Sequence, residues 1–131
     1  MTASSLSFRT AVVLALLGIL MGIIMAATHD HSLMPAHAHL NLLGWVSLFL
    51  FGIYYRLYPA IDTSRLALTQ VALWTLGTVI LTVGVAALNL GKAQAEPIAI
   101  AGSLLVLADM MLFALVVFRA TDTAAQTPSI A

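Results

Sequence analysis

Apolar residues fill most of this chain in long runs, and charged residues separate one run from the next. Ten charged residues are spread along the sequence, and they leave three gaps of 20, 25 and 26 uncharged residues. A helix that crosses a membrane needs about 20 mostly apolar residues. The pattern therefore predicts four membrane-spanning helices, which we place near residues 10–27, 35–57, 66–90 and 97–118.

Proline and glycine residues support these boundaries. Pro35 and Pro97 stand where the first turn of a helix tolerates proline. Pro59 and Gly91 follow the second and third predicted helices. The segments lack the alternation of a transmembrane β-barrel wall. We therefore expect an all-α protein, an integral membrane four-helix bundle forming one transmembrane domain over residues 1–131, with a frayed tail over residues 121–131.

Composition narrows the class of protein. Of 131 residues, 62% are hydrophobic and 8% are charged, whereas soluble domains carry about 25% charged residues. A water-soluble globule and a disordered chain are excluded on these grounds. Basic and acidic residues balance at five each, so no basic patch is expected for nucleic acid. The absence of cysteine excludes disulfides and thiolate metal sites, and the expected surroundings are membrane lipid.

The basic residues predict an orientation. Loops rich in lysine and arginine stay in the cytoplasm. The first predicted helix could alternatively be a signal peptide that is cleaved after Ala27, but its apolar run is long for that role. With four spans, both termini are expected in the cytoplasm, with loops 28–34 and 91–96 facing outward from the inner membrane of a bacterium. Lys92 is the one basic residue on the predicted outer side. The other four lie on the predicted inner side: Arg9, Arg56, Arg65 and Arg119.

Small residues indicate close helix packing. Gly18 and Gly22 form a small-xxx-small pair, and Gly77 and Gly84 recur at a spacing of seven. Such residues let helix backbones approach closely in a membrane. Their spacing does not identify the partner helix, which can belong to this chain or to another copy.

All four histidines fall within eleven residues, in the stretch HDHSLMPAHAHLN. Imidazole is the common protein ligand of zinc, copper and haem iron. His29, Asp30 and His31 belong to a predicted loop, where they are either solvated polar residues or metal ligands; Asp30 can also orient an imidazole. His37 and His39 begin a membrane helix, where a polar side chain is costly unless it is paired.

The spacing of His37 and His39 limits what they can bind together. Residues i and i+2 of a helix point about 200° apart, so the two rings are expected on opposite flanks. Two metal sites fit this arrangement, as does one cofactor ligand beside one hydrogen-bonding histidine. Asn41 follows His37 by four positions and therefore shares its face, where it can hydrogen-bond His37 or a ligand beside it.

The stretch HAHLNLLGWVSLFLFGIYYRLYP resembles helices of the catalytic subunit of haem-copper oxidases and nitric-oxide reductases. The second helix of that subunit carries a haem-ligating histidine in a similar context, matched here by His39 and Asn41. Its tenth helix carries an H-x-H pair whose histidines ligate two different haems, as His37 and His39 would. The resemblance covers about 25 residues strongly. The adjacent His-His pair of the family's copper site is absent, so one chain lacks a complete oxygen-reducing site and its status as an enzyme is open.

The resemblance implies a fold and a function. The family's twelve helices form three four-helix arcs, so a chain like one arc would rebuild that scaffold as a homotrimer, with a dimer as the alternative. It implies a haem b, or alternatively copper or zinc, near the outer face, serving electron transfer, sensing or metal handling. The competing hypotheses are a non-catalytic assembly subunit and a small channel or transporter.

Asp109 is the charged residue that interrupts the apolar run of the fourth predicted span. It lies about twelve residues from the outer end of its helix, or roughly 18 Å deep. A carboxyl group there should be protonated, paired or facing a cavity. Asp109 is a candidate proton relay; the alternative is a neutral group bonded to serine or threonine, or reaching toward Arg56. Polar residues along the third helix form either a channel wall or bonds to their own carbonyls, namely Thr75, Thr78, Thr82 and Asn89.

Overall fold

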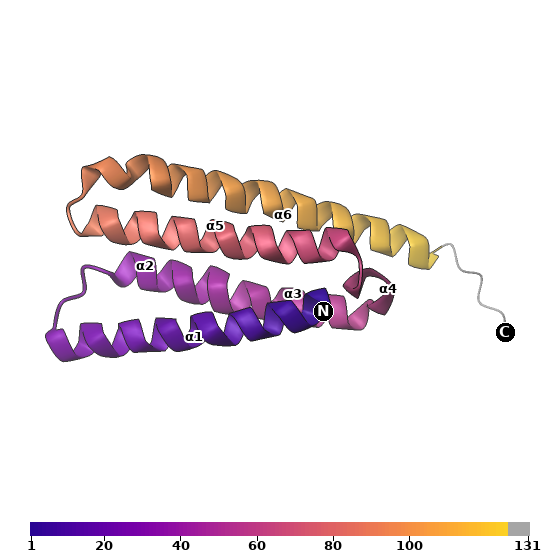
Figure 1. Cartoon of the computed structure of the whole chain (residues 1–131), viewed down its shortest axis with the longest axis horizontal. Coiled ribbons are helices and arrows are strands. Elements are labelled where there is room, and N and C mark those ends of the chain that lie inside the picture. The colour runs from indigo at the N-terminus through magenta and orange to yellow at the C-terminus, as the bar shows by residue number, and fades with distance from the viewer. Residues whose placement is uncertain (126–131) are drawn as a thin grey trace.

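The computed structural model describes residues 1–125, and all the regular secondary structure in that range is helical. Four helical spans run back and forth along the long axis of the molecule (Figure 1). Each is long and apolar enough to cross a membrane, which confirms the prediction of four spans. The first span is α1 (Ala3–Thr28), the third is α5 (Arg65–Asn89) and the fourth is α6 (Glu96–Ala125). The second, which we call the composite span, consists of α2 (Met34–His39), η1 (Leu40–Ser47) and α3 (Leu48–Leu57). Two short helices lie outside the spans, α4 (Pro59–Asp62) and η2 (Ala93–Ala95).

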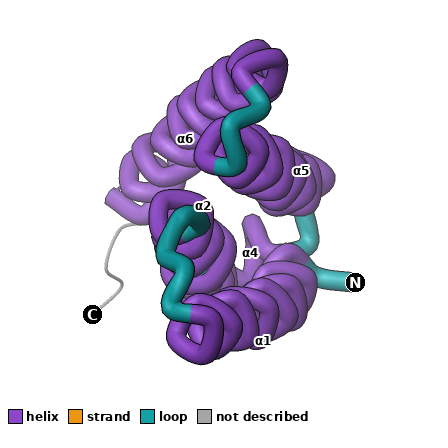
Figure 2. The backbone as a smooth tube through the Cα atoms, turned by 90° about the vertical axis from the view of Figure 1, so that its left-hand side faces the viewer, coloured by secondary structure: helices purple, strands orange, loops and turns teal. Residues whose placement is uncertain are grey.

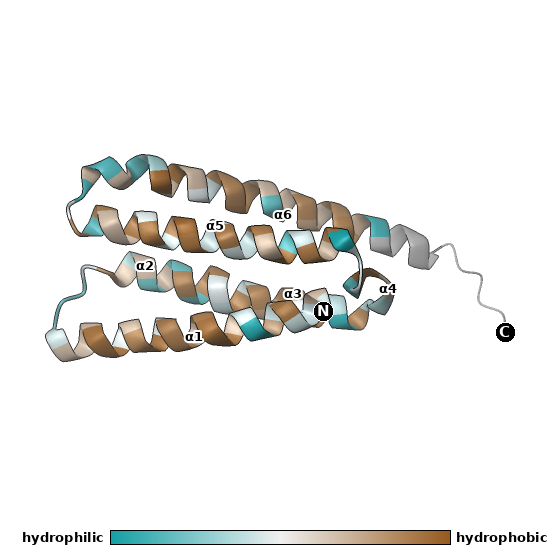
Figure 3. Ribbon diagram, in the orientation of Figure 1, coloured by the Kyte–Doolittle hydropathy of each residue, from teal (hydrophilic) through white to brown (hydrophobic). Residues whose placement is uncertain are grey.

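The two ends of the molecule differ in chemistry. Loops 29–33 and 90–95 lie together at one end, which we call the histidine end (Figure 1). Residues 1–9 and 56–65 form the opposite end, with α4, and we call it the arginine end. Hydrophobic residues cover the lengths of the spans between them, and hydrophilic ones gather near the ends (Figure 3). This is the distribution expected of a chain surrounded by lipid.

Two helices extend beyond their predicted limits. α1 begins at Ala3 rather than near residue 10, so Arg9 lies inside it. Thr2 caps this start, because its side chain accepts a hydrogen bond from the Ser5 amide at 3.2 Å. α6 continues past residue 118 to Ala125, so the expectation of a frayed tail is wrong for residues 121–125; residues 126–131 of that tail lie outside the described residues. Hydropathy marks where apolar surface ends, whereas helical hydrogen bonds continue into water.

The predicted loop between the second and third spans contains the one-turn helix α4, whose Asp62 is buried. Asp62 accepts hydrogen bonds from the Ser4 amide at 2.6 Å and the Ser4 hydroxyl at 2.7 Å. A carboxylate is favourable at a helix N-terminus, where amide hydrogens lack partners. Asp62 therefore ties α4 to the start of α1.

The spans pack as two layers, with α5 and α6 in one and α1 and the composite span in the other (Figures 1 and 2). α6 packs chiefly on α5, while α5 also contacts α1 and every part of the composite span. The shared core lies between the layers and includes Leu48, Phe51, Tyr55 and Trp74. Because α6 packs chiefly on one neighbour, much of its surface faces outward.

The glycine pairs place helices in close contact within this chain. A Cβ atom at Gly84 would lie 2.5 Å from the Ala99 backbone nitrogen of α6. A Cβ atom at Gly18 or Gly22 would meet side chains of the composite span. The prediction of close packing is therefore confirmed at these three positions, and the partners belong to the same chain.

Candidate cofactor pocket

The second span changes helix type immediately after the H-x-H pair. Residues 40–47 form a π-helix, η1, between the α-helical segments α2 and α3. Such segments are rare and occur frequently at functional sites. The Ser47 hydroxyl donates to the Leu42 carbonyl five residues earlier, at 2.9 Å. The Trp74 indole of α5 donates to the Leu43 carbonyl at 3.0 Å, so a neighbouring helix supplies a partner for the altered backbone.

His37 lies against α1. A Cβ atom at Gly22 would lie 3.1 Å from Cε1 of the His37 ring, so glycine leaves the room that the imidazole fills. The Asn41 side-chain amide donates to the His37 carbonyl at 2.8 Å and lies 3.3 Å from Nδ1. The predicted contact between His37 and Asn41 is confirmed. Both side chains pack in the interface between α1 and the composite span.

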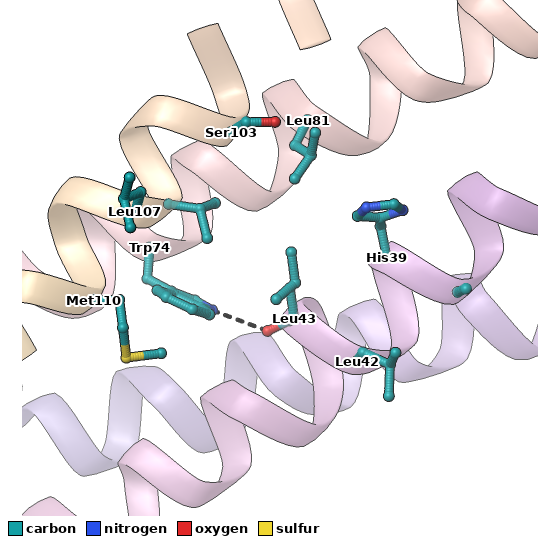
Figure 4. Close-up of a pocket in the computed structure, with 10 residues that line it drawn as sticks. His39, Leu42, Leu43, Trp74, Leu81, Ser103, Leu107 and Met110 are labelled. Atoms are coloured by element: carbon teal, nitrogen blue, oxygen red, sulfur yellow. Dashed lines mark hydrogen bonds between the residues drawn. The ribbon is translucent and has the colours of Figure 1, made fainter. Parts of the chain in front are cut away.

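His39 lies on the opposite flank of the helix, as the spacing predicted, and lines a pocket (Figure 4). Its Nδ1 lies 2.7 Å from the Pro35 carbonyl oxygen. A carbonyl can only accept a hydrogen bond, so Nδ1 carries a proton, and in the neutral ring Nε2 is then the acceptor. A hydrogen bond from one ring nitrogen to a backbone carbonyl is the usual way of orienting an imidazole that ligates a metal through the other nitrogen.

The pocket has a volume of about 540 Å³ and lies between the composite span, α5 and α6. This volume falls within the roughly 300–1,000 Å³ of sites that hold cofactors and other small molecules. Leu42 and Leu107 on its wall are 60% and 59% exposed, so the pocket opens onto the outer surface of the spans. Besides His39, the lining is mainly apolar: Ala38, Leu42, Leu43, Trp74, Leu81, Ser103, Val106, Leu107 and Met110.

The loop residues of the histidine cluster are exposed at the histidine end. His29 adopts a left-handed conformation, with φ 55°, and caps the end of α1. Asp30 accepts hydrogen bonds from the Ser32 hydroxyl and amide, which lower the pKa of its carboxyl from the ordinary value of an aspartate. Among the described residues, no three histidine, aspartate or glutamate side chains come together as a metal-binding group. A ligand role for His29, Asp30 and His31 stays a prediction.

Asp109 is buried, and its partner differs from the expected ones. The Gln70 side-chain amide donates to Asp109 Oδ2 at 2.7 Å, and the Tyr55 hydroxyl donates to Gln70 Oε1 at 2.8 Å. The expectation of a serine, threonine or Arg56 partner is therefore wrong. Asp109 Oδ1 is buried and has no hydrogen-bond partner among the described residues. Sequence reasoning overlooked Gln70, although a glutamine inside a predicted span is itself a signal.

The polar residues of α5 divide into two groups. Thr75 donates to the Val71 carbonyl and Asn89 to the Val85 carbonyl, both at 2.8 Å, as threonines and asparagines in helices often do. Thr78 and Thr82 are buried, and their hydroxyls have no partner within the described structure. Gln70, Trp74, Thr78 and Thr82 recur every four residues, so they form one polar face of α5.

Comparisons of this chain with protein-family models, with curated proteins and with solved structures find no match.

Proposed function

We propose that this chain is a haem-binding integral membrane protein in which His39 is the iron ligand. The observation that carries the proposal is the His39 ring itself. Its Nδ1 is fixed to the Pro35 carbonyl at 2.7 Å, and its Nε2 is left as an acceptor on the wall of a largely apolar pocket of about 540 Å³. A proximal histidine in an apolar cavity is the arrangement by which proteins commonly hold haem iron.

The donor set favours haem over a bare metal ion. Structural zinc sites take four protein ligands and catalytic ones take three. His39 is the histidine that lines the pocket, and the described residues contain no group of three potential ligands. The iron of a haem needs one or two axial side chains. The large flat porphyrin around the iron requires apolar walls, which Leu43, Trp74 and Leu81 provide. Copper and zinc remain the alternatives, with further ligands supplied by another copy.

His37 takes the hydrogen-bonding role in this proposal. The resemblance to oxidase helices implies two haems, one on each histidine of the H-x-H pair. Here the His37 ring fills the space beside Gly22 and lies beside Asn41. These contacts support one cofactor per chain, with His37 fixing α1 against the helix that carries His39.

A haem bound here supplies one-electron redox chemistry or a site for a small gaseous ligand, which suits electron transfer or ligand sensing. The chain's own part is to hold and shield the site. The Pro35 carbonyl fixes the ring orientation of His39, and the apolar walls exclude water. The pocket lies toward the histidine end of the spans, which the proposed orientation places near the outer face of a bacterial inner membrane.

A second copy of the chain would complete the pocket. Its open side is bordered by the exposed side chains Leu42 and Leu107, and α6 packs chiefly on α5. We propose a homotrimer, as the likeness to one oxidase arc implies, with a dimer as the alternative. Native mass spectrometry of the purified protein in detergent distinguishes these states from a monomer coated by lipid.

The test is spectroscopic and uses the two histidines as a matched pair. The full chain is purified in detergent and titrated with haem b, and the Soret band is recorded for the wild type, His39→Gln and His37→Gln. We expect a saturable Soret band for the wild type and His37→Gln, and its loss in His39→Gln. Circular dichroism melting shows that each variant is folded.

The contrary outcomes are equally specific. A folded wild type that binds no haem overturns the proposal. In that case, stoichiometric copper or zinc that disappears in His39→Gln identifies a metal site, whereas protein free of haem and metal favours an assembly subunit.

The polar face of α5 favours a second candidate, proton passage through the spans. Asp109 Oδ1, Thr78 Oγ1 and Thr82 Oγ1 are buried polar atoms with no partner in the part of the chain that the structure describes. Such atoms commonly bind internal water. Asp109 is then the proton relay, joined to Gln70 and Tyr55. Proteoliposomes with an entrapped pH-sensitive dye test this directly. Proton flux that Asp109→Asn abolishes supports the candidate, and flux equal to that of empty liposomes rejects it.

A further inference from the structure

A second pocket lies at the arginine end, far along the spans from His39. It has a volume of about 340 Å³. Its position at the border of the apolar spans places it where lipid headgroups lie. Two serines, one aromatic ring and two guanidinium groups line it: Ser4, Ser5, Phe8, Arg9 and Arg56.

Close packing of α1 on α3 brings the two arginines into this pocket. A Cβ atom at Gly52 would lie 2.7 Å from Cε1 of Phe8, so glycine is needed for the Phe8 ring to lie against α3. The ring also packs on Phe49, with centroids 4.9 Å apart. Arg9 follows Phe8, and Arg56 lies one helical turn beyond Gly52. The aromatic contact therefore holds together the helix turns that carry Arg9 and Arg56, and both arginines line the pocket.

No acidic side chain of the described structure pairs with Arg9 or Arg56 within 4.0 Å. The nearby carboxylate of Asp62 is already bound by the amide and hydroxyl of Ser4. Two cations that share a hollow repel each other, and the repulsion is stronger at a membrane border than in bulk water. An anion between them would remove that cost, and guanidinium groups bind phosphate in a bidentate manner.

We propose that this pocket binds the phosphate of an anionic phospholipid. The surface next to it supports a lipid over free phosphate. Val12, Val13 and Leu16 follow Arg9 on the same face of α1 and are 50%, 55% and 63% exposed. An acyl chain attached to the bound phosphate would lie on this apolar face, while the Phe8 ring contacts the glycerol region. This site is independent of the haem proposal, because it shares no residue with the His39 pocket.

The experiment measures lipid binding to the full chain in neutral detergent by native mass spectrometry. Phosphatidylglycerol is compared with phosphatidylcholine, and inorganic phosphate is added as a competitor. Arg9→Gln/Arg56→Gln is the test variant. Arg65→Gln is the matched control, because Arg65 is exposed at the same end but does not line the pocket.

We expect phosphatidylglycerol to bind more tightly than phosphatidylcholine. The double variant should lose about tenfold or more in affinity, the consequence of removing two charge-assisted contacts, and Arg65→Gln should bind as the wild type does. Equal binding of the two lipids, or equal loss in Arg65→Gln, overturns the proposal. Displacement of the lipid by millimolar phosphate also overturns it and identifies a site for free phosphate. Should the double variant fail to fold, Arg56→Gln alone is expected to show a partial loss, and unchanged binding contradicts the proposal.

Discussion

Replacing Gln70 with leucine should destabilise the protein, although leucine is the more apolar residue in a membrane helix. The Gln70 side chain is fully buried and joins Tyr55 of α3 to Asp109 of α6 by hydrogen bonds of 2.8 and 2.7 Å. Leucine has a similar volume, so the cavity contribution is small. The loss comes from the two polar groups that the substitution leaves without partners.

The structure sets the size of this loss. The variant leaves the Tyr55 hydroxyl and Asp109 Oδ2 buried and unpaired, next to Asp109 Oδ1, which already lacks a partner within residues 1–125. Each unsatisfied buried group costs about 1–3 kcal/mol in soluble proteins, whereas hydrogen bonds within membrane proteins average about 0.6 kcal/mol. For two bonds, these limits predict that Gln70→Leu lowers the free energy of unfolding by about 1–6 kcal/mol.

Unfolding in mixed micelles of mild detergent and dodecyl sulfate, followed by circular dichroism, measures this difference. The triple variant Tyr55→Phe/Gln70→Leu/Asp109→Leu is the decisive comparison, because removing every member of a buried polar group is nearly neutral. We expect it to be more stable than Gln70→Leu alone. A Gln70→Leu protein within about 0.5 kcal/mol of the wild type, or a triple variant less stable than the single one, would refute this reasoning.

Three further predictions concern packing, the π-helical segment and pH. Gly84→Ala should lower the melting temperature more than Gly22→Ala does. The new methyl group meets the backbone of α6 at Gly84, whereas at Gly22 it meets only the His37 side chain. An equal fall in the melting temperature of the two variants contradicts this prediction. Trp74→Phe removes the donor to the Leu43 carbonyl and should lower the free energy of unfolding by about 1 kcal/mol, measured by the same unfolding assay. An unchanged free energy of unfolding would show that the carbonyl finds another partner. The pKa of Asp30 should lie below the ordinary value of an aspartate because the Ser32 hydroxyl donates to its carboxylate. The stabilisation of this loop is therefore present at neutral pH and is lost as the pH falls through the lowered pKa. An NMR titration that gives Asp30 the pKa of an aspartate in an unstructured peptide, or a higher one, contradicts this.

Helix number and the opposed histidines were predictable from the sequence, because each depends on a regular period. Runs of about 20 apolar residues indicate spans whatever their packing. The angle of about 200° between His37 and His39 follows from helix geometry alone. Which neighbour each ring meets depends on packing, and only the structure shows that Gly22 leaves room for His37 while His39 lines the pocket.

The features that the sequence did not reveal depend on contacts between distant segments or on small changes in the backbone. Gln70 and Asp109 are 39 residues apart, and their hydrogen bond exists because α5 and α6 pack closely along their length. The π-helical segment, residues 40–47, is mostly apolar, so its sequence pattern predicts an ordinary membrane helix. The early start of α1 likewise depends on Ser4 meeting Asp62 of α4.

Haem binding by His39→Gly, with and without added imidazole, tests the central proposal most directly. Glycine removes the ligand and leaves space for a free imidazole to take its place. We predict that the folded variant loses the Soret band of the ligated haem and regains it when imidazole is added, whereas His37→Gly keeps the band throughout. A His39→Gly protein that retains the wild-type band without imidazole would contradict the assignment of His39 as the ligand, as would a folded variant that imidazole does not restore.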